Sequence, residues 1–138
     1  MTRNDLEVMI AGCPFHRQLG LQLEDFDEAG GWLMISLTAQ QALSRDDEWV
    51  ELHGGVIASL IDIAGDYAVA LKIGRGVPTI SLHVDYLRFA RGTKAVATAK
   101  VVKCGRSIAV VDIEVSDETG SLIAIGRGSY SSVVKAAA

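Results

Sequence analysis

The feature that most constrains this chain is the segment 56–73, which is apolar on almost every side at helical spacing. Gly74 and Gly76, followed by Pro78, predict where this helix ends. A helix that is apolar nearly all round must be covered by other elements. The chain has 138 residues, enough for one domain, and a sheet wrapped around the helix is the simplest cover.

The flanking segments predict that sheet. A short helix is expected over residues 3–11 and a loop over 39–52. Strand-like segments at 19–26 and 32–38 flank two glycines and predict an antiparallel hairpin. Alternation predicts four further strands that follow one another as a meander, at 79–89, 94–103, 107–116 and 121–133. The predicted fold class is α+β, a curved antiparallel sheet around one long central helix, in a single domain spanning residues 1–138.

Composition excludes several classes of protein. Hydrophobic residues make up 49% of the chain, which favours a folded core over disorder. No apolar run approaches the roughly 20 residues of a membrane span, and Asp5 and Glu7 lie where a signal peptide would be apolar. We therefore expect a cytoplasmic protein without a membrane partner. Cys13 and Cys104 do not form a metal or redox motif and are expected to be free thiols.

The charge is acidic overall but locally basic. A net charge of −4 and a pI near 5.3 disfavour a nucleic-acid partner. No Asp or Glu occurs from 86 to 111, a stretch that contains Arg88, Arg91, Lys94, Lys100, Lys103 and Arg106. These side chains either protect a strand edge from aggregation or bind a small phosphorylated ligand.

Two carboxylates lie on the central helix. Gly55, Ser59, Asp62 and Asp66 form one narrow stripe. Like charges four residues apart destabilise a helix, and burying an unpaired carboxylate raises its pKa or costs several kcal/mol. The pair is therefore either held by structural hydrogen bonds or part of a functional site, with a carboxylate acting as general base or nucleophile.

The start of the same helix carries His53-Gly54-Gly55. Glycines allow a ligand to approach the backbone closely, and unpaired N–H groups at a helix N-terminus stabilise developing negative charge. These residues either shape a tight turn capped by His53 or form an oxyanion hole.

Gly54 and Asp62 cannot reach one carbonyl within a single helix, because eight residues at 1.5 Å separate them by about 12 Å. Two antiparallel copies of the helix would bring Gly54 of one subunit to Asp62 of the other. This spacing predicts an obligate dimer with two shared sites. An acyl compound that carries an adenine nucleotide would also account for the basic segment.

Several motifs together resemble a known family. They are Glu51-Leu52-His53-Gly54-Gly55 followed by Asp62, the segment from Thr79 to Arg88, the segment from Pro14 to Gly20, Lys103-Cys104-Gly105-Arg106, and the closing segment from Gly120 to Ala124. This pattern resembles the hotdog-fold acyl-CoA thioesterases of the phenylacetic-acid-degradation (PaaI-like) type, and the resemblance covers nearly the whole chain.

The resemblance implies a hydrolase that cleaves a CoA thioester as a dimer or tetramer. CoA is part of the substrate, so no cofactor is expected. No metal is expected either, because Asp62 and Asp66 are followed by no further His, Asp or Glu at helix spacing. It implies that Asp62 is nucleophile or general base, that the Gly54 N–H polarises the thioester carbonyl, and that Thr79 helps to place water. His53 and Gly55 belong to the same motif. CoA phosphates are expected to contact the basic residues Arg88, Arg91 and Arg106.

The chain also departs from that family. Asp47 stands where many relatives carry Asn, which puts the positioning of water in doubt. Asp66 stands where relatives often carry Ser or Thr, and it is expected to line the acyl pocket or to share a proton with Asp62. Two alternatives to the thioesterase are a non-catalytic acyl-CoA-binding module and an enoyl-thioester hydratase or dehydratase. Only His83 and Asp85 offer the paired histidine and acid that the last of these needs.

The remaining histidines and most of the aromatic residues are expected to have structural roles. His83 is expected to form a structural hydrogen bond, and His16 is expected at the surface. Most of the aromatic residues are expected to anchor the core or an interface, and Trp49 is expected to line the acyl channel. The aromatic set is Trp32, Trp49, Tyr67, Tyr86 and Phe89.

Overall fold

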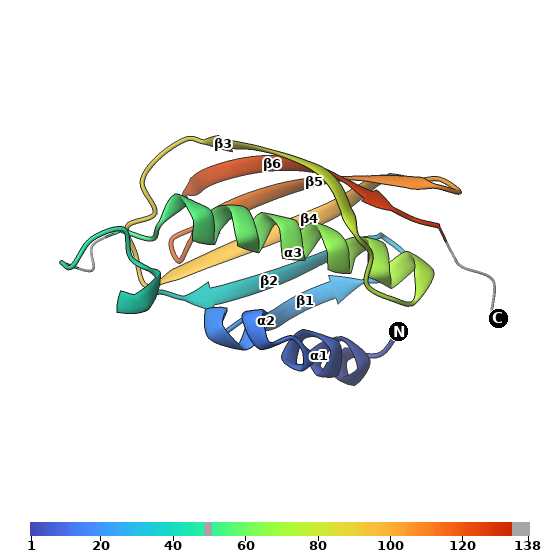
Figure 1. Ribbon diagram of the computed structural model, residues 1–138, viewed down its shortest axis with the longest axis horizontal. Coiled ribbons are helices and arrows are strands. Elements are labelled where there is room, and N and C mark those ends of the chain that lie inside the picture. Colours follow the sequence, from blue (N-terminus) through green and yellow to red (C-terminus); the bar gives the residue numbers. More distant parts are fainter. Residues whose placement is uncertain (49–50, 134–138) are drawn as a thin grey trace.

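A computed structural model describes residues 1–48 and 51–133. Along the chain its elements are α1 (Arg3–Gly12), α2 (Pro14–Leu19), β1 (Gln22–Asp27), β2 (Trp32–Thr38), the 3₁₀ turn η1 (Gln41–Leu43), α3 (Gly54–Ile73), β3 (Thr79–Tyr86), β4 (Lys94–Cys104), β5 (Ile108–Asp117) and β6 (Leu122–Ser131). The long helix α3 lies against one face of the curved sheet (Figure 1). This confirms the expected α+β hotdog arrangement.

The central helix α3 begins two residues earlier than the sequence pattern predicts. His53 is its N-cap residue, and the His53 side chain accepts a hydrogen bond from the Gly55 N–H, so the helix includes both glycines. At the other end Gly74 adopts a left-handed conformation with φ of 80° and ends the helix, as expected. The buried side of α3 is continuous from Ile57 to Leu71.

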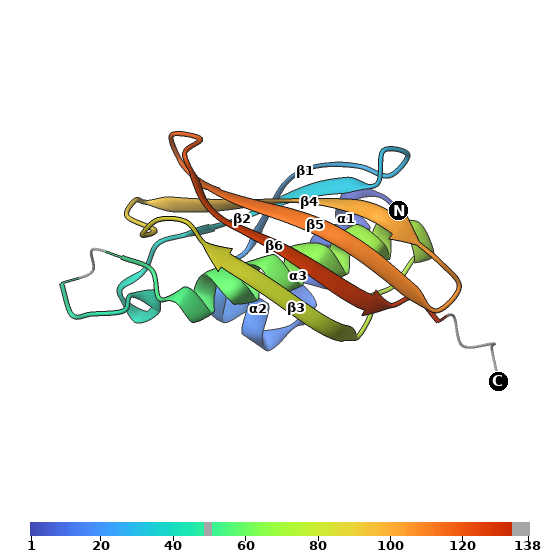
Figure 2. The same ribbon diagram turned by 90° about the horizontal axis from the view of Figure 1, so that it is seen from above.

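The sheet is antiparallel throughout, with strand order β1-β2-β4-β5-β6-β3. The β1–β2 hairpin is confirmed, but the meander of four strands is wrong. Only β4, β5 and β6 follow one another as neighbours, whereas β3 pairs with β6 at the far edge (Figure 2). Short turns join β4 to β5 and β5 to β6. The longer segment 87–93 connects β3 to β4 and therefore passes β6 and β5, which lie between them in the sheet.

This topology leaves β3 at an edge of the sheet, beside α3. Residues along β3 are mostly exposed, and Ile80 and Tyr86 are 57% and 54% exposed. The expected strand over 79–89 is therefore too long by three residues. After Tyr86 the chain turns away, because the N–H groups of Leu87 and Arg88 both donate to the Ile123 carbonyl.

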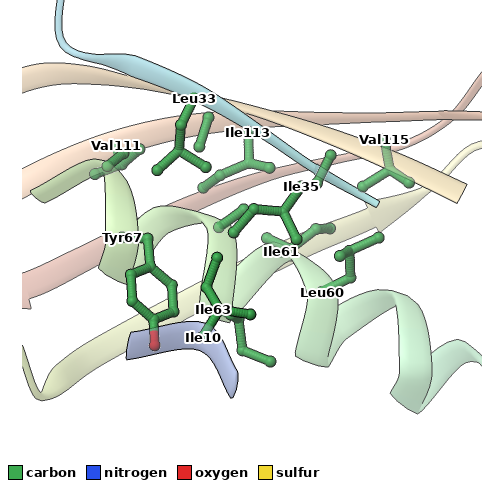
Figure 3. Close-up of a cluster of buried hydrophobic side chains, with 14 of the residues drawn as sticks. Ile10, Leu33, Ile35, Leu60, Ile61, Ile63, Tyr67, Val111, Ile113 and Val115 are labelled. Atoms are coloured by element: carbon green, nitrogen blue, oxygen red, sulfur yellow. The ribbon is translucent and has the colours of Figure 1, made fainter. Parts of the chain in front are cut away.

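The core fills the space between α3 and the concave face of the sheet (Figure 3). Its members include Leu33 and Ile35 of β2, Leu60 and Ile61 of α3, and Ile113 of β5, each at most 1% exposed. Side chains on alternate strand positions meet the buried side of the helix. The apolar pattern of the sequence is thus satisfied by one shared core.

Glycines allow the helix to lie close to β6. A Cβ on Gly65 would clash with the Tyr130 hydroxyl. That space lets Tyr130, which is fully buried, donate a hydrogen bond of 3.1 Å to the Asp62 carbonyl. A buried hydroxyl without a partner would cost free energy, so this contact fixes the helix on the sheet at the turn that carries Asp62.

The N-terminal segment contains one helix more than expected. A capping box between Thr2 and Asp5 begins α1. Pro14 does not only end α1: it occupies the first position of α2, where a proline is favoured. Because α2 and the left-handed Gly20 use residues 14–20, β1 begins at Gln22, later than the expected 19.

Candidate active site

The N-terminal end of α3 is held by hydrogen bonds that leave one donor free. Gly55 N–H donates to His53 Nδ1 over 2.8 Å, and the N–H groups of Val56 and Ile57 donate to the His53 carbonyl. Within residues 1–48 and 51–133, no group accepts a hydrogen bond from the Gly54 N–H. This unpaired donor, at the positive end of a 20-residue helix, is suited to bind an anion or a polarised carbonyl oxygen.

The two glycines have different reasons to lack a side chain. A Cβ on Gly55 would lie 3.0 Å from His53 Nδ1, so a side chain there would displace the capping imidazole by a few tenths of an ångström. A Cβ on Gly54 would lie nearest to the Tyr86 side chain, at an ordinary contact distance of 3.4 Å. The fold tolerates a methyl group at position 54, and the glycine there leaves free space beside its N–H.

A cavity of about 750 Å³ opens at this turn. Its walls come from the loop before α3, from the start of α3, from the end of β3 with the segment after it, and from β6. The lining residues are Arg45, Leu52, His53, Gly54, Gly55, Ile57, Tyr86, Leu87, Arg88, Phe89, Ala90 and Ile123. Most of these side chains are apolar, with arginines among the rest, which suits an apolar group attached to an anionic one.

Asp62 lies two turns further along α3 and is half-buried. Thr79, at the start of β3, donates its hydroxyl to Asp62 Oδ1 over 2.6 Å. Within the described chain no group donates to Asp62 Oδ2. The structure thus brings together Asp62 and Thr79, 17 residues apart in sequence, and leaves one carboxylate oxygen able to accept a proton.

Asp66 has a different environment. Its Oδ1 accepts a hydrogen bond of 2.6 Å from the backbone N–H of Val77. Burial raises the pKa of the Asp66 carboxyl to about 6, the Val77 N–H opposes that rise, and the nearby charge of Asp62 adds to it. Asp66 therefore anchors the segment that leads from α3 into β3, and it does not line the cavity beside Gly54.

The basic residues do not converge within one chain. Arg88 lines the cavity, whereas Arg91 donates to Glu51 Oε1 over 2.7 Å. Arg106 follows the far end of β4, and ten strand steps of about 3.3 Å separate the two ends of β4 by roughly 33 Å. Of the three expected phosphate ligands, only Arg88 and Arg91 lie at the end of the sheet near Gly54.

Asp47 is exposed in the loop before α3. Within the described residues Asp47 forms no hydrogen bond to Asp62, whose Oδ1 accepts from Thr79, so a role of Asp47 in positioning water stays a prediction. Trp49, expected in the acyl channel, lies outside the described residues.

Two residues at this end of the molecule were not identified from the sequence. Arg45 lines the cavity and, like Arg91, pairs with Glu51 and stacks on the Phe89 ring. Tyr86 was expected to be a core or interface anchor, but its hydroxyl donates to the Gly54 carbonyl over 2.8 Å. Alternation along β3 places Tyr86 on the face of Leu82 and Val84, which pack toward the core, and this was the available signal.

The other histidines have structural contacts. His83 bonds Asp85 over 3.1 Å, as expected, and both side chains are largely exposed. His16 is half-buried rather than at the surface: Nδ1 contacts the Ile10 carbonyl, and burial lowers the pKa of the ring. Both cysteines are free thiols.

The described residues contain neither a metal-binding cluster nor a helix that could span a membrane. No group of three or more His, Cys, Asp or Glu side chains could hold a metal ion in the described ranges. Among the helices of residues 1–48 and 51–133, none is both long and apolar enough to cross a membrane.

Comparison with known proteins places this geometry in a family. Residues 51–124 match the thioesterase superfamily model, and the match begins just before the His53-Gly54-Gly55 turn. The chain is 32% identical to a Salmonella typhimurium protein named medium/long-chain acyl-CoA thioesterase YigI, over 90% of this chain and 88% of that one.

Solved structures of other proteins share this fold. A protein of the thioesterase superfamily superposes with a TM-score of 0.84 at 37% identity, covering 93% of this chain and 98% of the other. The Escherichia coli PaaI protein from the phenylacetic acid degradation operon superposes with a TM-score of 0.83, over 95% of this chain and 92% of its own, and at 23% identity this shows the shared fold alone. The chain belongs to the thioesterase superfamily.

Proposed function

We propose that this protein hydrolyses acyl-CoA thioesters, using the Gly54 N–H as oxyanion donor and Asp62 as general base or nucleophile. The observation that carries the proposal is the Gly54 N–H, which has no acceptor in the described chain and lies in the wall of a largely apolar cavity. A thioester carbonyl needs such a donor, because negative charge develops on its oxygen during attack.

In the general-base route, Asp62 Oδ2 accepts a proton from water while the water oxygen bonds to the thioester carbon. The carbon–sulfur bond then breaks and CoA leaves as a thiolate, which needs little acid assistance because thiols ionise near pH 8.5. In the nucleophilic route an Asp62 oxygen bonds to the thioester carbon, the carbon–sulfur bond breaks and CoA leaves as a thiolate, and water then hydrolyses the resulting anhydride to free acid and Asp62. In both routes Thr79 holds Asp62 Oδ1 through its hydroxyl, which leaves Oδ2 for the reaction. No cofactor or metal is required.

A second copy of the chain completes the site in this proposal. Gly54 and Asp62 of one helix lie about 12 Å apart, too far to act on one carbonyl. The exposed edge strand β3 and the half-exposed stripe of α3 with Ser59 and Asp62 are adjacent surfaces that a second copy would cover. An antiparallel dimer, alone or paired into a tetramer, places Gly54 of each subunit near Asp62 of the other. Arg106 then approaches the cavity only from the partner.

The cavity favours an apolar acyl group. Ile57 and Ile123 are at most 2% exposed and form its inner wall, and Arg88 supplies a positive charge at the same site. The relative in Salmonella typhimurium is named for medium- and long-chain acyl-CoA, and we propose this chain-length class here as well. A cytoplasmic location stays a prediction from the sequence.

The proposal is tested by measuring release of free CoA thiol from short-, medium- and long-chain acyl-CoA, phenylacetyl-CoA and hydroxybenzoyl-CoA. We expect turnover that is highest for medium or long chains. Asp62→Asn protein, purified in the same way, controls for contaminating thioesterases. Tight binding of every substrate without turnover by the wild-type protein would contradict the proposal and favour an acyl-CoA-binding module.

A further inference from the structure

Tyr86 forms a hydrogen bond that the fold alone does not require. Its hydroxyl donates to the Gly54 carbonyl over 2.8 Å, from the last residue of β3 to the first residue of α3. Tyr86 is 54% exposed in the single chain, so burial does not force the hydroxyl to find a protein partner. A helical carbonyl also accepts the N–H four residues further on, so Gly54 does not depend on this second donor.

The peptide group between Gly54 and Gly55 is therefore held from both sides. Its carbonyl oxygen accepts from Tyr86, and its N–H, which belongs to Gly55, donates to His53 Nδ1 over 2.8 Å. Two consecutive glycines have more backbone freedom than any other pair of residues. Fixing the plane of this peptide restricts the rotations on either side of it, including those that set the direction of the preceding Gly54 N–H.

We infer that Tyr86 is a positioning residue: with His53 it fixes the peptide between Gly54 and Gly55, and so directs the Gly54 N–H at the substrate carbonyl. This inference rests on the proposed function. Tyr86 acts through Gly54, although its ring also lines the cavity. Thr79 begins β3 and bonds Asp62, while Tyr86 ends β3 and bonds Gly54. One edge strand thus sets the orientation of both reacting groups of its own chain.

The test compares Tyr86→Phe with Tyr67→Phe. Both remove a single hydroxyl, but Tyr67 is buried and its hydroxyl contacts His16, away from the turn. We expect Tyr86→Phe to lower kcat for the best acyl-CoA by about three- to tenfold, with KM within twofold, because the loss of a hydrogen bond is felt when charge develops on the carbonyl. Tyr67→Phe should leave both constants within twofold of the wild type.

A second measurement separates positioning from general loosening. A CoA ketone, in which a methylene replaces the thioester sulfur, binds without reacting, and its carbonyl stretch reports hydrogen bonding to the oxygen. The wild-type protein should shift this stretch to lower frequency, Tyr86→Phe should reduce the shift, and Tyr67→Phe should not. A structural effect would instead lower Tm and raise KM while the carbonyl shift stayed at the wild-type value.

The outcomes also separate this inference from the proposed function. Wild-type protein that hydrolyses acyl-CoA, together with a Tyr86→Phe variant of equal kcat and equal carbonyl shift, overturns the role of Tyr86 alone. Wild-type protein that hydrolyses none of the acyl-CoA substrates overturns the proposed function and this inference with it.

Discussion

Asp62 and Asp66 lie one turn apart on the same stripe of α3, yet their surroundings differ. Asp62 accepts from a side-chain hydroxyl, that of Thr79, and keeps its second oxygen free. Asp66 accepts from the Val77 N–H, and burial raises the pKa of its carboxyl to about 6. Asp66, whose pKa is raised, is committed to the fold, so a raised pKa alone does not identify the reactive group.

The largest expected difference between the two is in turnover. We expect Asp62→Asn to lower kcat at least about 100-fold, because an amide cannot take a proton from water or attack a carbonyl. Asp66→Asn should lower kcat by no more than about threefold, because its oxygen can still accept from the Val77 N–H. Release of CoA thiol measures both. Equal losses in the two variants would show that the carboxylates act as a pair.

Gly54→Ala tests the oxyanion turn without touching either carboxylate. The added methyl group meets the Tyr86 ring at an ordinary distance of 3.4 Å, so Tm should change by no more than about 2 °C. We expect kcat/KM to fall by roughly 10- to 100-fold, because the methyl group occupies space beside the N–H that polarises the substrate. Gly12→Ala is the matched control, since a Cβ there meets nothing within 4 Å. Activity retained by Gly54→Ala would exclude this turn as the oxyanion site.

Thr79→Val keeps the shape of the side chain and removes the hydroxyl that holds Asp62 Oδ1. We expect kcat to fall by about tenfold, since Asp62 stays present but is less well oriented. Thr79→Ser restores the donor and should recover most of the loss in the same assay. A serine variant as slow as the valine variant would indicate that the methyl group, and not the hydroxyl, matters at this position.

The smallest effect concerns stability as a function of pH. The pKa of Asp66 is raised from 3.8 to about 6 in the folded protein, so the folded state binds more protons than the unfolded state between these values. This contribution to stability is full below pH 3.8 and is lost as pH rises through about 6, with an upper limit of ~3 kcal/mol.

The check is the free energy of unfolding of wild-type and Asp66→Asn protein, measured by urea denaturation from pH 4 to pH 7. As pH rises, the free energy of unfolding of the wild type should fall relative to that of Asp66→Asn, because only the wild type has a buried carboxyl group that becomes charged. A difference that is constant across this range would contradict the account of Asp66.

The sequence predicts the helices and strands better than it predicts the order of the strands in the sheet. The apolar segment that became α3, the β1–β2 hairpin and the later strands follow from local pattern and turn residues. The position of β3 does not, because alternation shows that 79–86 is a strand but not which strand it pairs with. The path of residues 87–93 across the sheet decides that, and it depends on tertiary packing.

The candidate site shows a similar division. The sequence pattern indicates Gly54 and Asp62, and helix geometry predicts their separation. The structure adds that the Thr79 hydroxyl bonds Asp62 directly. The anchoring of Asp66 to Val77 depends on how the chain leaves the helix. The bond from Tyr86 to Gly54 depends on how the far end of β3 meets the start of α3. Alternation along β3 indicates which face Tyr86 occupies, but the local sequence does not identify the partner of either Tyr86 or Asp66.

The central claim is that Gly54 of one copy and Asp62 of another act on the same thioester. Co-expression of Gly54→Ala and Asp62→Asn chains tests it, because each mixed dimer would contain one site with both changes and one site with neither. Random pairing makes half of the dimers mixed, so the account predicts recovery of about a quarter of wild-type CoA release, from two variants that are each nearly inactive. Activity no higher than the average of the two separate variants would contradict it, and would show that Gly54 and Asp62 of different copies do not act on one thioester.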